Sequence, residues 1–261
     1  MVAGAKIPLP VDLSGQRVAI TAGAGGIGRV MADSFAARGA RVFVCDVDEI
    51  ALASCPHPAM RADMARAAEI DAFMDAALDA LDGLDVLVNN AGIAGPTGPV
   101  EDVAEDALRA TMAIDLESMF HATRRAIPAL RKAGGGSIVN LSSSAGRFGF
   151  RYRTPYAAAK WGVVGLTKSL SIELGPDNIR VNCLQPGLVE GPRIRAVLAA
   201  KAKAAGVGDN EMTQQALANA SLGCFVTQQD IANMALYLCS PFGATISGQA
   251  IAIDGDLQRL T

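Results

Sequence analysis

Short apolar runs alternate with longer amphipathic stretches along the whole chain, and this alternation limits the folds that the chain can adopt. The apolar runs are strand-like and occupy 17–21, 41–45, 85–89, 137–141 and 179–184. Helical periodicity fills the longer intervals, over 27–38, 65–81, 104–132 and 155–174. Nearly continuous apolar strands separated by helices are typical of a parallel sheet that is buried on both faces. The sequence therefore predicts an α/β fold, a doubly wound parallel sheet of about seven strands with helices on both faces and its ligands at the carboxyl ends of the strands.

Length and charge narrow the class of protein further. A chain of 261 residues without a linker-like tract suits one domain over 1–261, with an N-terminal extension of about 1–12. The net charge of -3 and the absence of a basic run argue against a nucleic-acid or anionic-membrane partner. No apolar stretch approaches a membrane span, and residues 1–12 lack the apolar core of a signal peptide. Five scattered cysteines without a Cys-x-x-Cys pair indicate neither disulfides nor a metal site, so we expect a cytoplasmic protein.

A glycine-rich segment at 21–28 joins the first strand to the first helix and predicts a nucleotide site. Its glycines let a pyrophosphate approach the N-terminus of the helix, where free N–H groups favour anions. A bare tight turn is the alternative for this segment taken alone. The residues expected to hold the coenzyme here are Gly23, Gly26, Ile27 and Gly28.

Aspartate 46, at the end of the second strand, points to the identity of the coenzyme. A carboxylate at this place accepts hydrogen bonds from both adenosine ribose hydroxyls and repels a 2′-phosphate. No arginine or lysine lies beside Asp46 or within the glycine turn to bind that phosphate. We therefore expect NAD rather than NADP, although Asp46 could also be a solvated turn residue.

Later segments complete the predicted coenzyme site. Asp63 is a candidate contact for the adenine amino group, and Pro186-Gly187 is expected to turn over the nicotinamide. The Asn-Asn-Ala-Gly segment closes a strand with small residues that let the backbone pass close to a cofactor. Asn89 could equally cap its strand without touching a ligand. Three residues of this segment are expected at the coenzyme: Asn89, Ala91 and Gly92.

Tyr156, Lys160 and Ser143 form the candidate catalytic set. A phenol with an ordinary pKa of about 10 is a poor base at neutral pH. Lys160 follows one helical turn later and shares a helix face with Tyr156, so its ammonium group favours the phenolate. Ser143 can donate a hydrogen bond to a carbonyl or alkoxide oxygen held beside the phenol. The set predicts proton transfer to or from an alcohol oxygen.

The glycine turn, Asp46, Asn-Asn-Ala-Gly, Ser143, Tyr-x-x-x-Lys and Pro186-Gly187 occur in an order that resembles the short-chain dehydrogenase/reductase family. The resemblance extends from about residue 12 to the C-terminus. It implies that Tyr156 is the acid/base, that Lys160 also binds the nicotinamide ribose, and that Ser143 binds the substrate oxygen. It further implies that the backbone of Val189 contacts the carboxamide, and that the protein is a homotetramer.

Two departures from the family pattern affect the site. The first glycine of the turn is Ala22 here, which costs little if its φ is negative. Asp115 occupies the place of an asparagine that helps the family anchor a proton-relay water. An ionised aspartate accepts hydrogen bonds but donates none, and its charge would raise the pKa of Lys160. We keep Asp115 as a candidate catalytic residue.

Arginines near the tyrosine suggest an anionic substrate. Arg147, Arg153 and Arg193 lie in segments that the family places around the substrate, and a guanidinium binds a carboxylate or sulfonate bidentately. The alternative is that these arginines face solvent or pair at a subunit contact. Residues of about 193–222 read as two short helices with a break at 206–208, and the segment of about 188–225 is a candidate substrate loop or lid.

Together these features predict an NAD-dependent oxidoreductase that interconverts a secondary alcohol and a ketone. Small hydroxy acids or sugar acids are the expected substrates, bound by Ser143, Tyr156 and the arginines. The alternatives are a reductase of 3-oxoacyl or of cyclic or aryl ketones, and a catalytically silent NAD-binding sensor or scaffold. The last alternative finds support in Ala22 and Asp115 and is opposed by the intact set of Ser143, Tyr156 and Lys160.

Overall fold

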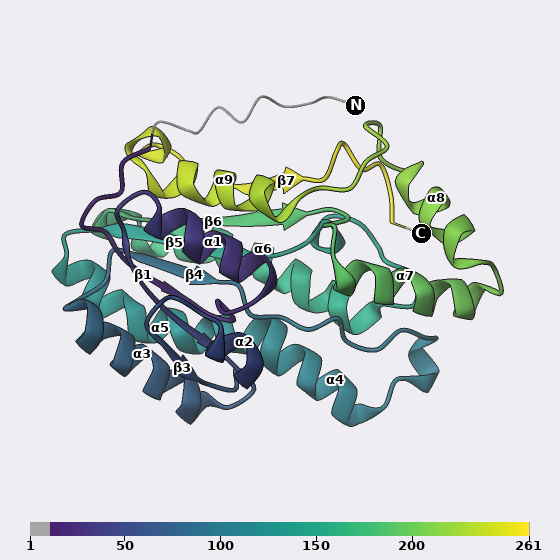
Figure 1. The fold of residues 1–261 in the computed structure, drawn as a ribbon, viewed down its shortest axis with the longest axis horizontal. Coiled ribbons are helices and arrows are strands. Elements are labelled where there is room, and N and C mark those ends of the chain that lie inside the picture. Colours follow the sequence, from purple (N-terminus) through teal and green to yellow (C-terminus); the bar gives the residue numbers. More distant parts are fainter. Residues whose placement is uncertain (1–10, 261) are drawn as a thin grey trace.

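The computed structural model describes residues 11–260, and its seven strands form one parallel sheet in the order β3-β2-β1-β4-β5-β6-β7 (Figure 1). Every neighbouring pair is parallel. The strands are β1 (Arg17–Ile20), β2 (Arg41–Asp46), β3 (Ala59–Arg61), β4 (Val86–Asn89), β5 (Gly136–Leu141), β6 (Ile179–Pro186) and β7 (Ala250–Ile253). The strand order reverses between β1 and β4, as expected of a doubly wound sheet, so the predicted fold class is confirmed.

Two layers of helices bury the sheet. Alternate residues of β1 point to opposite faces: Val18 and Ile20 pack under α1 and α9, whereas Ala19 packs on the side of α3 and α5. This explains why both kinds of position are apolar in the sequence. The helices of the two layers are α1 (Gly26–Ala36) and α9 (Gln228–Cys239) on one face, and α3 (Ala67–Leu81), α5 (Ser118–Lys132) and α6 (Thr154–Leu174) on the other.

The helix predicted over 104–132 forms over 105–132 and contains one π-helical turn. It consists of α4 (Glu105–Met112), a π-helical turn (Ala113–Glu117) and α5. The inserted turn carries Asp115, whose Oδ1 accepts a hydrogen bond of 2.6 Å from the backbone N–H of Ile93. Single π turns inside α-helices often occur at functional sites, and this one directs a carboxylate toward the carboxyl end of β4.

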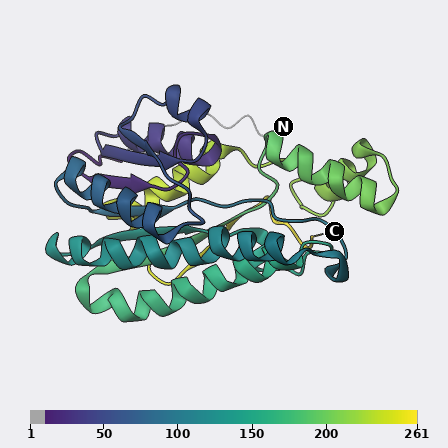
Figure 2. The ribbon, with the colours of Figure 1, turned by 90° about the horizontal axis from the view of Figure 1, so that it is seen from below.

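Two helices stand over the carboxyl ends of the strands. α7 (Pro192–Ala205) and α8 (Asp209–Leu217) extend beyond the sheet layers in both ribbon views (Figure 2). They pack on each other through a separate apolar cluster that includes Leu198, Ala202 and Met212. The predicted break at 206–208 is confirmed, because Gly206 ends α7 in the left-handed conformation with φ 70°.

The remaining described elements are short. They are α2 (Glu49–Ala53) and the 3₁₀ turns Val100–Asp102, Ser144–Gly146, Gly175–Asp177 and Pro241–Gly243. Within 11–260, no helix is both long enough and apolar enough to cross a membrane. The extension predicted over 1–12 falls mostly outside the described residues, and Val11 already belongs to the core.

Candidate active site

The turn between β1 and α1 is held in place by hydrogen bonds from the segment that follows β4. The hydroxyl oxygen of Thr21 accepts hydrogen bonds of 2.9 Å from the N–H groups of Asn90 and Ala91. The side-chain amide of Asn90 donates to the carbonyl oxygens of Thr21 and Ala22 at 3.0 and 2.9 Å. These four hydrogen bonds fix the position of the glycine turn. Asn90 and Ala91 therefore hold the turn that is expected to bind the coenzyme.

Ala22 adopts a strained conformation in this turn. Its φ is 50°, in the left-handed region, whereas the sequence argument supposed a negative value. Left-handed backbone costs a non-glycine residue about 1–2 kcal/mol, so the hydrogen bonds of Asn90 hold a strained turn in place. Gly26 is also left-handed, with φ 53°, and a side chain there would meet open space.

The N-terminus of α1 is open to a ligand. Gly25 is the N-cap and offers no side chain to the first N–H groups of the helix. Gly25, Gly26 and Ile27 line the cavity described below. An uncapped helix N-terminus presents N–H groups and a positive partial charge, which suit a pyrophosphate.

Asp46 lies at the adenosine end predicted for the coenzyme. Its Oδ2 accepts from the N–H of Ala24 at 3.1 Å, and its Oδ1 accepts from Val47 and Asp48 at 2.9 and 3.2 Å. The carboxylate lines the cavity and keeps lone pairs for ribose hydroxyls. Asp48 and Ala51 border the same end, so the residues present fit an adenosine ribose without a 2′-phosphate.

Several residues expected at the coenzyme do not line the cavity. Asn89 is corrected: its buried side chain donates to Thr123 and Asn140 at 3.1 and 2.8 Å and joins β4 to its neighbours. Asp63 accepts from Ala65 N–H and lies outside the cavity lining, so the structure does not place it at the adenine. Gly23 and Gly28 instead allow the turn to pack closely. A Cβ at Gly23 would lie 2.7 Å from Val44, and one at Gly28 would lie 2.1 Å from the carbonyl oxygen of Ala22.

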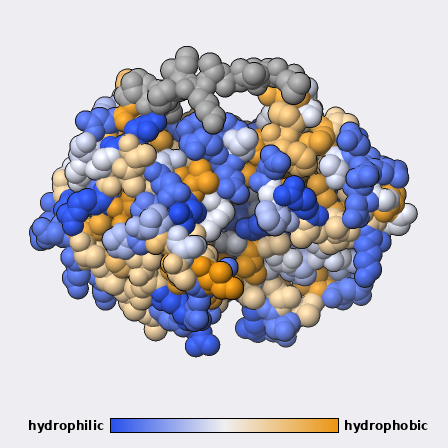
Figure 3. Space-filling view, in the orientation of Figure 1, coloured by the Kyte–Doolittle hydropathy of each residue, from blue (hydrophilic) through white to orange (hydrophobic). Residues whose placement is uncertain are grey.

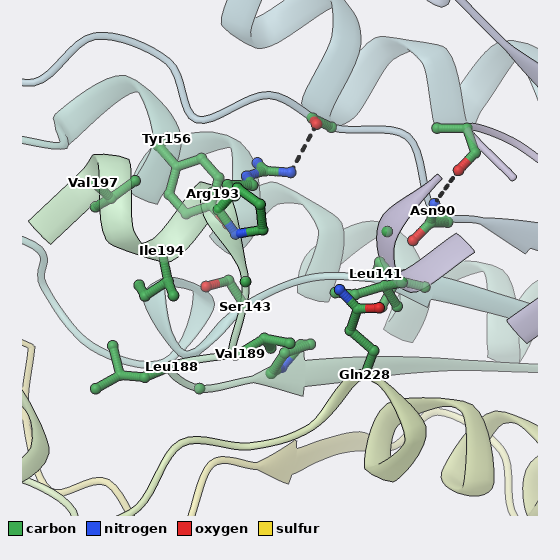
Figure 4. Close-up of a pocket in the computed structure, with 18 of the residues that line it drawn as sticks. Asn90, Leu141, Ser143, Tyr156, Leu188, Val189, Arg193, Ile194, Val197 and Gln228 are labelled. Carbon is green, nitrogen blue, oxygen red and sulfur yellow. Dashed lines mark hydrogen bonds between the residues drawn. The ribbon is translucent and has the colours of Figure 1, made fainter. Parts of the chain in front are cut away.

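The structure brings Tyr156, Lys160 and Ser143 together at the cavity (Figure 4). Lys160 lies one turn along α6 from Tyr156, with its Nζ 5.6 Å from the phenol ring centroid. It donates to the carbonyl oxygen of Leu141, at the carboxyl end of β5, at 3.1 Å. Ser143 Oγ accepts from the N–H of Ala145 at 3.1 Å, which leaves its O–H free to donate to a substrate oxygen.

Asp115 lies behind the catalytic lysine. Its side chain is 0% exposed, and Oδ2 is 4.0 Å from Lys160 Nζ. Burial raises the pKa of the Asp115 carboxyl, and the nearby charge of Lys160 opposes that rise. Gly92 packs against both groups, since a Cβ there would lie 3.0 Å from Asp115 and 3.2 Å from Lys160. Gly92 and Lys160 line the cavity, whereas Asp115 does not. The carboxylate thus acts on the lysine rather than on a bound ligand.

Replacing Asp115 with asparagine is expected to move the pH–rate profile of the enzyme to lower pH by about one unit. The substitution removes a carboxylate 4.0 Å from Lys160 Nζ, so the positive charge of the lysine is no longer partly offset and proton loss from the bound alcohol is favoured at lower pH. Measuring kcat for alcohol oxidation between pH 5 and about pH 10 checks this. An unmoved profile would show that Asp115 does not influence the proton transfer.

The three predicted substrate arginines have different surroundings. Arg153 is buried, donates to the carbonyl oxygen of Ala94 and has its guanidinium carbon 4.8 Å from the Tyr156 ring centroid. Arg193 lines the cavity and donates to the carbonyl oxygen of Gly92 at 2.9 Å (Figure 4). Arg147 is corrected: it pairs with Asp254 at 3.0 Å, donates to the oxygen of Leu257 and does not line the cavity.

A cavity of about 520 Å³ connects these groups, and the surface between the α2 and α7 sides is hollowed in the space-filling view (Figure 3). Asp46 and Asp48 border one end, whereas Arg153, Tyr156 and Arg193 border the other. Pro186, Gly187 and Val189 line the wall between them, as predicted. Leu188, Ile194 and Val197 of the candidate lid also line the cavity. Further lining residues that were not predicted are Phe150, Gln228 and Leu260.

The doubly wound sheet, the open helix N-terminus and the paired Tyr156 and Lys160 define a nicotinamide-dependent oxidoreductase. A sequence profile described as Enoyl-(Acyl carrier protein) reductase matches residues 21–257, which is most of the chain. The chain belongs to the short-chain dehydrogenase/reductase family. The family's members use NAD or NADP and act on CH–OH donors, so this protein is an enzyme of secondary alcohol and ketone interconversion.

Individual relatives cover nearly the whole chain. The trans-4-hydroxycyclohexanecarboxylate dehydrogenase of Sinomonas cyclohexanicum is 38% identical over 260 residues, covering 94% of this chain and 93% of the relative. The D-beta-hydroxybutyrate dehydrogenase of Rhizobium meliloti (strain 1021) is 31% identical, covering 90% and 96%. The crystal structure of levodione reductase superposes with a TM-score of 0.87 at 26% identity, covering 93% of this chain and 97% of that one.

Proposed function

We propose that this enzyme oxidises a hydroxy acid with NAD⁺. The observation that carries the proposal is the division of charge along one cavity. Asp46 and Asp48, after β2, lie at the end suited to adenosine, whereas Arg153 and Arg193 lie at the end of Tyr156, and Glu190 is a further acidic residue of the lining. A cationic pocket around the reacting carbon favours an anionic substrate over a neutral alcohol.

The residues beside the cavity supply the proton chemistry. Tyr156, as phenolate, accepts the proton of the substrate hydroxyl, while Ser143 donates a hydrogen bond to the same oxygen. Lys160 Nζ lies 5.6 Å and the Arg153 guanidinium carbon 4.8 Å from the ring centroid, so two cations stabilise the negative charge that develops during proton transfer. NAD⁺, when bound, supplies the acceptor for the hydride that leaves the carbinol carbon. The alcohol becomes a ketone, and Tyr156 holds the released proton.

Asp46→Asn is expected to reduce the preference for NAD⁺ over NADP⁺ by about tenfold. Asparagine keeps the shape of the side chain but removes the charge that repels a 2′-phosphate. The ratio of kcat/KM for the two coenzymes, measured at saturating alcohol, checks the expectation. An unchanged ratio would contradict the role that we give to this carboxylate.

Two observations support a hydroxy acid as the substrate: the arginines that line the cavity and the names of two similar proteins. Two similar proteins are named for oxidising hydroxy acids, trans-4-hydroxycyclohexanecarboxylate and D-beta-hydroxybutyrate. The test compares kcat/KM for each acid with that for its methyl ester, which keeps the hydroxyl and removes the charge. We expect the acids to exceed the esters by about 10- to 100-fold. Equal kcat/KM values for the acid and its ester would mean that Arg153 and Arg193 do not bind the substrate.

Reduction of a cyclic ketone is the second candidate, and the superposition on levodione reductase favours it. The same residues would run the reaction in reverse, with Tyr156 donating the proton. Rates of cyclohexanone reduction by NADH, compared with rates for the hydroxy acids, decide between the two.

The assembly and location complete the proposal. Exposed apolar side chains on the neighbouring helices α4, α5 and α6, namely Leu108, Phe120 and Trp161, support a homotetramer. The five cysteines are free, which supports a reducing cytoplasm.

The segment from Leu188 to Phe225 lines the substrate end with Leu188, Ile194 and Val197, which supports its role as a substrate lid.

A further inference from the structure

Lys201 is a buried cation whose role the proposed reaction does not explain. It lies on α7, is 4% exposed, and has its Nζ 4.5 Å from the centroid of the Phe150 ring. Within residues 11–260, no carboxylate lies within 4 Å of this ammonium, and no side chain or carbonyl accepts a hydrogen bond from it. The ammonium itself is not fully enclosed, so water or a ligand in the adjoining space can reach it while the stem stays buried.

The neighbours of Lys201 are positive. Burial, together with the charges of Arg153 and Arg151, lowers the pKa of Lys201 to about 8. Arg153 is itself 2% exposed, and its Nε has no hydrogen-bond partner among the described residues. Two buried cations therefore lie on the same aromatic ring, because the guanidinium of Arg153 is 5.2 Å from the Phe150 centroid. An anion is the group that would satisfy both.

A small cavity beside Lys201 adjoins the main one. It measures about 20 Å³ and shares Phe150, Leu188, Ile194, Val197 and Leu260 with the wall of the larger cavity. Lys201 and Arg259 line its far side. A space of this size holds one water or one carboxylate oxygen. Lys201 thus lines the small cavity and Arg153 lines the larger one, with Phe150 in the wall of both.

We propose that Lys201, together with Arg153, binds the carboxylate of the substrate at this side of the cavity, and that the carboxylate is remote from the reacting carbon. This inference rests on the proposed oxidation of a hydroxy acid and narrows its substrate class. The groups contact one another in the order Tyr156, Arg153, Phe150, Lys201. A 2-hydroxy acid carries its carboxylate on the carbon next to the hydroxyl and does not extend past Phe150. A carboxylate that lies across a six-membered ring from the reacting hydroxyl does extend past Phe150.

The first test measures binding without turnover. Cyclohexanecarboxylate has no hydroxyl to oxidise, so calorimetric titration of the NAD⁺-loaded enzyme reports the anion site alone. We expect Lys201→Met to weaken this binding at least about tenfold, because a charged hydrogen bond is lost. Lys203→Met is the matched control, since Lys203 is exposed on the same helix. Equal affinity in the Lys201 variant and the wild type, or an equal loss in the control, overturns the proposal.

Stability separates this role from a structural one. Methionine fills the volume of the lysine stem without a buried charge, so Lys201→Met is expected to melt at or above the temperature of the wild type. A variant that unfolds more easily and also loses binding would indicate that Lys201 supports the packing of α7, and that result would overturn the proposal.

The second test compares two acids as substrates. We expect trans-4-hydroxycyclohexanecarboxylate to exceed lactate in kcat/KM by at least about 100-fold in the wild type, and by about tenfold less in Lys201→Met. A preference for lactate would overturn the placement of the carboxylate. If the acid binds through Lys201 but no hydroxy acid is oxidised, the anion site stands and the proposed dehydrogenase function fails.

Discussion

Replacing Tyr156 with phenylalanine is expected to lower kcat for alcohol oxidation by about a thousandfold while NAD⁺ binding stays intact. Tyr156 lines the cavity beside Ser143 and Lys160, and its hydroxyl is the group placed to accept the substrate proton. Phenylalanine keeps the ring that packs against Arg153 and removes only the acid/base group. Initial rates of NADH formation give kcat, and calorimetric titration of NAD⁺ shows whether the coenzyme site is unchanged.

Tyr152→Phe is the matched control for this experiment. The Tyr152 hydroxyl accepts a hydrogen bond from Arg151, and Tyr152 does not line the cavity, so its loss is expected to change kcat less than about twofold. Wild-type turnover by Tyr156→Phe would contradict the mechanism.

The second large effect is expected at Gly28. A Cβ added there would lie 2.1 Å from the carbonyl oxygen of Ala22 and 2.5 Å from the side-chain nitrogen of Asn90. The helix and the turn must then separate, and the hydrogen bonds from Asn90 that hold the strained Ala22 are lost or stretched. We expect Gly28→Ala to weaken NAD⁺ binding by about 100-fold, with a lower melting temperature, because a strained contact of this kind costs about 1–3 kcal/mol.

Gly175→Ala makes the same chemical change where there is room for it. Gly175 ends α6, its added Cβ meets no atom within 4 Å, and its φ is -55°. This control is expected to bind NAD⁺ as the wild type does. Circular dichroism of both variants distinguishes a local loss of the coenzyme site from general unfolding. Wild-type affinity in Gly28→Ala would refute the close packing of turn and helix.

The parts of the site that could be predicted from sequence lie within short segments. Tyr156 and Lys160 share a helix face, and Asp46 ends a recognisable strand, so spacing alone indicates their positions. The parallel sheet was equally predictable, because its strands are apolar on both faces. In each of these cases the local sequence and the final fold favour the same structure.

The features that could not be predicted depend on contacts between distant segments. Lys201 and Gln228 reach the cavities from α7 and α9, and nothing in their neighbouring residues marks them. Asn89 and Asn90 are adjacent in sequence, yet one joins strands in the core and the other holds the glycine turn. The left-handed Ala22 is set by those hydrogen bonds and not by its own preference.

The central claim, hydride transfer from a secondary alcohol to NAD⁺, is tested most directly by isotope transfer. Trans-4-hydroxycyclohexanecarboxylate labelled with deuterium at the carbinol carbon is incubated with the enzyme and NAD⁺, and the reduced coenzyme is recovered for mass spectrometry. The account predicts reduced coenzyme that carries one deuterium. Reduced coenzyme without deuterium, or none formed from any secondary alcohol tried, would contradict it.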